Sequence, residues 1–109
     1  MKTRIRFTSL ALALMLSSGA ALADLKIGVS MSQFDDTWLT YLRESMDKKA
    51  RSMPGGVNLQ FEDARSDVVK QLSQVENFIS QKVDAIVVNP VDTAATQKIT
   101  AAAVKRSEE

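Results

Sequence analysis

Segments with the two-residue period of a β-strand alternate along this chain with longer segments that have the period of an amphipathic α-helix. Apolar and polar or small side chains alternate over 25–32 and again over 57–62, as in half-buried strands. The segment 83–88 contains a continuous apolar run, which is typical of a strand covered on both faces. Apolar side chains spaced by three and four residues predict three helices, at about 37–53, 68–79 and 94–104.

This order of strands and helices, with short connections, restricts the fold class. Strict alternation predicts an α/β protein with a doubly wound parallel sheet and helices on both of its faces. Right-handed crossovers make 2-1-3 the simplest strand order, with the first strand in the middle. Ligands of such sheets bind beyond the carboxyl ends of the strands, where the winding reverses. We therefore expect the functional residues in the loops 32–37 and 89–93.

Composition argues against catalysis. The chain has no His and no Cys, so it lacks the commonest general base, a thiolate nucleophile and the usual zinc ligands. Its four glycines cannot form either of the glycine-rich loops that cradle phosphates. No nucleophile–base pair is visible, and two adjacent acids are weak grounds for a metal site. We predict a binding protein, with no catalytic residues, no metal and no cofactor.

The first 23 residues have the three parts of a secretory signal peptide. Lys2, Arg4 and Arg6 form a basic start, an apolar stretch follows at 7–16, and small residues at 21 and 23 form a cleavage site. Cleavage after Ala23 would leave a single domain, 24–109, that has more acidic than basic residues. A basic nucleic-acid footprint is then absent. A bacterial periplasm is the predicted location.

The loop after the first strand holds two carboxylates between two aromatic rings, namely Phe34, Asp35, Asp36 and Trp38. A carboxylate accepts charge-assisted hydrogen bonds from neighbouring hydroxyl groups, and an aromatic ring can lie on the C–H face of a sugar. Asp92 lies in the loop after the third strand. These five residues are the candidate ligand-binding residues, and they suit a sugar or cyclitol better than an anion.

Each candidate also has a purely structural interpretation. Asp36 and Asp92 stand where a helix N-cap is expected, and Asp35 is better explained as a solvated acid. Trp38, at the start of an amphipathic helix, is a candidate for the core. A loop aromatic such as Phe34 has less structural reason to be there.

The tracts KIGVSMSQFDDTWLTYLRESM and VDAIVVNPVD resemble the N-terminal part of periplasmic sugar-binding proteins of ABC importers, of the ribose type. The resemblance is greatest to the inositol- and rhizopine-binding members. It implies a type I periplasmic binding protein fold, of which 24–109 would be an incomplete N-terminal part of the sugar-binding lobe. It also implies that Asp36 holds sugar hydroxyls, that Trp38 stacks on the ring, and that an inner-membrane ABC permease is the partner. The alternatives are a truncated, non-binding remnant of such a protein and the core of a sugar-responsive regulator.

Overall fold

A computed structural model describes residues 25–108 of the chain. The predicted signal peptide at 1–23 and its cleavage after Ala23 lie outside the described residues. The described chain forms a three-stranded parallel sheet from β1 (Leu25–Met31), β2 (Val57–Asp63) and β3 (Ala85–Val88), in the order β2-β1-β3. The predicted parallel sheet and its 2-1-3 order are confirmed.

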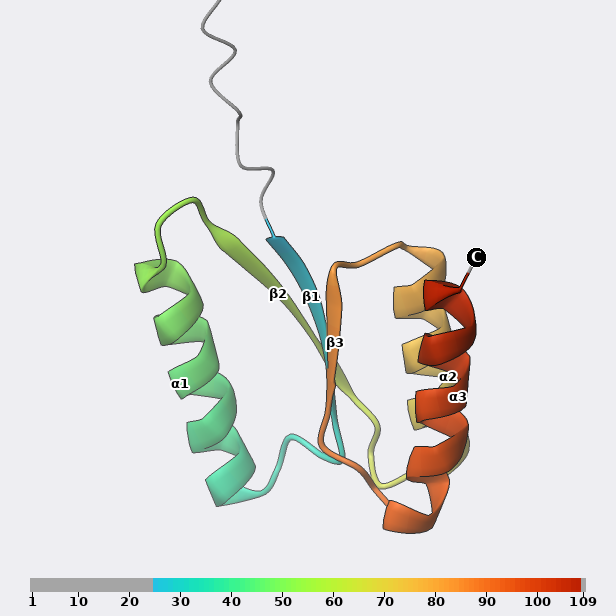
Figure 1. Cartoon of the computed structure of the whole chain (residues 1–109). Coiled ribbons are helices and arrows are strands. Elements are labelled where there is room, and N and C mark those ends of the chain that lie inside the picture. Colours follow the sequence, from blue (N-terminus) through green and yellow to red (C-terminus); the bar gives the residue numbers. More distant parts are fainter. Residues whose placement is uncertain (1–24, 109) are drawn as a thin grey trace, which may run out of the picture.

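Helices cover both faces of this sheet, as predicted (Figure 1). The helix α1 (Thr37–Ser52) lies on one face, and α2 (Val68–Ser80) and α3 (Thr96–Ser107) lie on the other. A single 3₁₀ turn, η1 (Thr93–Ala95), precedes α3, so the third helix begins two residues later than its sequence pattern suggested. No helix within 25–108 is long and apolar enough to cross a membrane.

The core between α1 and the sheet is built from β1 and β2. Val29, Met31 and Leu39 are buried there, and partly buried apolar residues surround them. All of the surrounding residues come from α1, its preceding loop, β1 or β2: Ile27, Phe34, Leu42, Met46, Leu59 and Phe61. Because β3 contributes nothing to this cluster, the two-sided covering predicted for the third strand is only half correct. Val87, on this face of β3, remains 43% exposed.

The opposite face of the sheet packs closely against α2. Val75 and Phe78 are fully buried, as the helical pattern predicted, but Val68 is exposed. The side chains of Gln71 and Gln74 are buried on the same helix. The buried face of α2 is therefore partly polar, which the apolar periodicity did not indicate.

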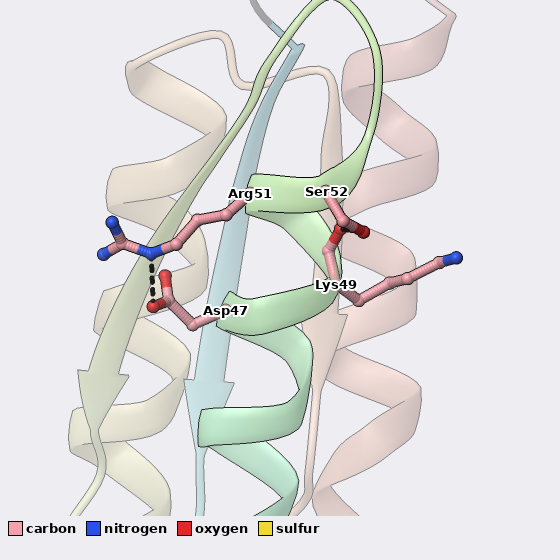
Figure 2. Close-up of polar contacts among 4 residues, drawn as sticks. All are labelled: Asp47, Lys49, Arg51 and Ser52. Atoms are coloured by element: carbon pink, nitrogen blue, oxygen red, sulfur yellow. Dashed lines mark hydrogen bonds and ion pairs between the residues drawn. The ribbon is translucent and has the colours of Figure 1, made fainter.

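The helix α1 ends in ordinary helix-terminal chemistry (Figure 2). Arg51 Nε donates to Asp47 Oδ2 at 2.8 Å, and Ser52 Oγ donates to the carbonyl oxygen of Lys49 at 2.7 Å. The basic side chains in the last turn, Lys49 and Arg51, interact favourably with the negative end of the helix dipole. Beyond the helix, the positive φ angles of Gly55 and Gly56, 86° and 79°, explain why the chain reverses at glycines.

Candidate functional site

Three loops leave the carboxyl ends of the three strands at the same edge of the sheet (Figure 1). Ser32, directly after β1, joins them. Its carbonyl oxygen accepts from Ser66 N at 2.7 Å, while its backbone N and Oγ both donate to Asn89 Oδ1, at 3.1 and 2.6 Å. The loops after β1, β2 and β3 are thus connected by hydrogen bonds.

Asp36 caps α1 and keeps one carboxylate oxygen available. Its backbone is extended, and Oδ1 accepts from Leu39 N at 3.0 Å. Within the described residues, no hydrogen bond is formed by Oδ2. Asp36 is only partly buried, so this second oxygen can accept from a ligand hydroxyl. The structure confirms the N-cap interpretation.

Trp38 projects from the first turn of α1 and is 66% exposed. This exposure contradicts the alternative that Trp38 is a core residue. A large aromatic ring with so much accessible surface, beside the free oxygen of Asp36 in the chain, is suited to stacking on a ligand.

Phe34 is a support for the loop more than a free ligand surface. It packs on the core cluster of Val29, Met31 and Leu39. The guanidinium of Arg43 lies 4.0 Å from the centre of its ring, within the range of a cation–π contact. Since Arg43 covers one ring face, at most the other face remains for a ligand.

The two remaining acids differ in their surroundings. Asp35 is exposed and makes no hydrogen bond within the described residues. Asp92 caps η1, with Oδ1 accepting from Ala94 N at 2.8 Å, which confirms its predicted capping role. Its loop is connected to that of Asp36 through Asn89 and Ser32. Asn89 was not singled out from the sequence, although an Asn directly after an apolar strand could have indicated such a connection.

The candidate site consists of three carboxylates and one exposed ring, in the loops after β1 and β3 and at the start of α1. These residues, Asp35, Asp36, Trp38 and Asp92, are called the shelf below. No group of three or more His, Cys, Asp or Glu side chains suited to a metal occurs within 25–108. An apolar hollow of about 390 Å³ lies elsewhere, between β3 and α3, and is lined by residues such as Ile86 and Ile99. None of the shelf residues is buried: Asp36 is partly buried, and Asp35, Trp38 and Asp92 are exposed.

Residues 27–107 match the family model of the periplasmic binding protein domain. The chain is 54% identical over 84 residues to the "Putative rhizopine-binding protein" of Rhizobium meliloti, covering 77% of this chain and 26% of that protein. It is 75% identical over 36 residues to a myo-inositol-binding protein of a Pseudomonas species, covering 33% of this chain and 97% of that sequence.

A solved structure is similar as well. An ABC transporter solute-binding protein from Bacillus halodurans, with bound myo-inositol, superposes with a TM-score of 0.71 at 42% identity, covering 77% of this chain and 29% of that one. The chain thus spans between a quarter and a third of the length of the rhizopine relative and of this structure. The parallel sheet with strand order β2-β1-β3 is consistent with the family match over 27–107. The chain belongs to the periplasmic binding protein domain family.

Proposed function

We propose that residues 24–109 form the N-terminal part of the sugar-binding lobe of a periplasmic solute-binding protein. The ligand is a polyol that carries no negative charge, namely inositol, rhizopine or a related sugar, which is delivered to an ABC permease in the inner membrane. Two observations carry the proposal: Asp36 accepts its capping hydrogen bond through Oδ1, and Trp38, two residues later in the first turn of α1, is 66% exposed. The names of the rhizopine- and inositol-binding relatives support the ligand class.

The chemistry of the shelf favours a neutral ligand over an anion. Three carboxylates, those of Asp35, Asp36 and Asp92, belong to its two loops. They would repel a carboxylate or a phosphate, whereas ring hydroxyl groups can donate to them. A cyclitol presents such donors around its edge and C–H groups on its faces, which are the two kinds of group that Asp36 and Trp38 are suited to contact.

The exposure of the shelf limits the affinity of this chain alone. Pockets for small ligands normally bury most of the ligand surface, whereas Asp35, Trp38 and Asp92 are all exposed. We expect binding in the millimolar range for the 109-residue chain, and the non-binding remnant stays the competing interpretation.

Fluorescence of Trp38 tests the proposal directly, because it is the only tryptophan of the chain. Addition of myo-inositol is expected to change its emission saturably and shift it to shorter wavelength, since a stacked ligand displaces water from a ring that is 66% exposed. The control is an equal concentration of glycerol, which has hydroxyl groups but no ring face. An emission that responds to neither additive would contradict a polyol site at Trp38, and an equal response to both would contradict stacking on the face of a ring.

Export is a separate prediction of the proposal. In a Gram-negative host, mass spectrometry of the periplasmic extract should find a product that begins at Asp24. Ala23→Arg is the matched control, because a large charged residue at the cleavage position should block processing. A product in the periplasmic or cytosolic extract that retains Met1 would contradict the signal peptide.

A further inference from the structure

Gln71 is a buried polar side chain whose hydrogen bonds all lead to the sheet edge described above. It is 1% exposed, on the second turn of α2. Its Nε2 donates to the carbonyl oxygen of Asn89 at 2.9 Å and to Ser30 Oγ at 3.2 Å, and its Oε1 accepts from Val91 N at 2.9 Å. One side chain thus satisfies two backbone groups of the loop after β3.

The neighbouring contacts fix the orientation of this amide. The hydroxyl hydrogen of Ser30 is donated to Gln74 Oε1 at 2.8 Å, so Ser30 Oγ is left as an acceptor for Gln71 Nε2. Turning the Gln71 amide over would place its oxygen against the carbonyl of Asn89 and its NH₂ group against the N–H of Val91. Leaving such buried groups without partners costs free energy, so a single arrangement is favoured.

The loop after β3 depends on this side chain. The last ladder bond of β3 is donated by Asn89 N to the carbonyl oxygen of Ser30, at 2.9 Å. Pro90 follows and has no N–H to donate. Gln71 then holds Asn89 O and Val91 N on either side of Pro90. In this position the Asn89 side chain accepts from Ser32, at the start of the loop that carries Asp36.

We propose that Gln71 is a positioning residue that sets the loop 89–92 against the loop 32–36 from beneath the sheet edge. It does not touch the ligand. Its contribution is preorganisation, because a shelf whose loops are already fixed loses less entropy when a ligand binds. The effect on the conformation of the loop 89–92 follows from the hydrogen bonds of Gln71 alone, while the effect on ligand affinity rests on the proposed function.

Gln74 provides a matched control on the same helix. It is 7% exposed; its Oε1 accepts from Ser30 Oγ, and its Nε2 donates to the carbonyl oxygen of Asp63, at the end of β2, at 2.9 Å. Removing it leaves both bonds of Gln71 to the loop 89–92 in place. Gln71→Met and Gln74→Met remove the same chemical group from similar surroundings. Only the first variant removes partners of the loop 89–92.

Amide hydrogen exchange in the ligand-free chain is the test. In Gln71→Met, exchange at Val91 should accelerate at least about tenfold relative to Asn89, whose N–H is held by the sheet and reports overall stability. In Gln74→Met, the ratio of the two rates should stay as in the wild type. Equal acceleration of Val91 and Asn89 in Gln71→Met would show a merely structural role and overturn the proposal.

The wild-type chain gives a second measurement, which decides the matter even where Gln71→Met does not fold. The Val91 amide should be protected from exchange, and the side-chain NH₂ of Gln71 should show nuclear Overhauser contacts to Asn89. An unprotected Val91 would overturn the proposal.

The effect on ligand binding is measured by titration with myo-inositol, followed by Trp38 emission. The affinity should fall severalfold in Gln71→Met and stay unchanged in Gln74→Met, and an equal fall in both variants would overturn the proposed effect on binding. A wild-type chain that does not bind myo-inositol would refute the proposed function, while the exchange measurements would still decide the role of Gln71.

Discussion

Replacing Gly28 by alanine is expected to lower the urea midpoint of this chain substantially. Gly28 lies on the central strand, in register with Gln60 of β2 and Ile86 of β3. A Cβ atom there would stand 2.4 Å from the nearest ring carbon of Phe78. The strand cannot retreat, because both of its edges are hydrogen-bonded, and the ring is 1% exposed and enclosed. Overpacking of this kind costs about 1–3 kcal/mol or more, a large share of the stability of a small domain.

Urea denaturation followed by circular dichroism measures this effect. Phe78→Ala should itself cost about 3–5 kcal/mol through the cavity it leaves. Because the missing ring makes room for the methyl group, the double variant Gly28→Ala with Phe78→Ala should be no less stable than Phe78→Ala alone. Asp47→Ala is the surface control, since its exposed ion pair with Arg51 contributes little. A wild-type midpoint in Gly28→Ala would contradict the close packing of β1 on α2.

The substitution Asp36→Ser is expected to remove the binding of myo-inositol to this chain. Serine preserves the N-cap that Asp36 provides through the bond from Leu39 N, so the helix should remain. The lost interaction is a charge-assisted hydrogen bond to the ligand, which contributes about 1.5–3 kcal/mol. That corresponds to an affinity about tenfold to a hundredfold lower. Since the proposed function gives the wild-type chain only a millimolar affinity, the expected result is no measurable binding in the Trp38 fluorescence titration.

The variant Asp67→Ser is the control, because it makes the same change of charge and of N-cap residue at the start of a different helix. Asp67 caps α2 by accepting from Val69 N and Lys70 N. The control therefore replaces another N-cap aspartate by serine on a neighbouring loop. It should leave the affinity for myo-inositol unchanged. Equal losses in the two variants would mean that Asp36 acts through helix capping or net charge and does not hold the ligand.

Periodicity was sufficient to predict the sheet, because its order depends on alternation and handedness alone. It was insufficient for the buried faces. Gln71 and Gln74 can be buried because they form hydrogen bonds with residues far away in the sequence, among them Asn89 and Ser30. The spacing of apolar residues does not indicate these hydrogen bonds. Val87 was predicted to be covered and is exposed, because α1 packs over β1 and β2.

The candidate site was predicted in part. The position of the loops followed from the topology, and the capping roles of Asp36 and Asp92 followed from their places before helices. The exposure of Trp38 and the cover of Arg43 over Phe34 could not be predicted, since both depend on which side of α1 faces the sheet. The prediction of a binding protein that is not an enzyme, made from the absence of His and Cys, is confirmed by the family.

The most direct test of a polyol site at this sheet edge is a titration of the ¹⁵N-labelled chain with myo-inositol, followed by NMR. The predicted result is saturable shifts of backbone amides confined to 32–39 and 89–93, with a millimolar dissociation constant. In the same titration of Asp36→Ser, the chemical shifts of these amides should not change. Shifts that are absent from both segments, or that centre on the apolar hollow between β3 and α3, would contradict the assignment.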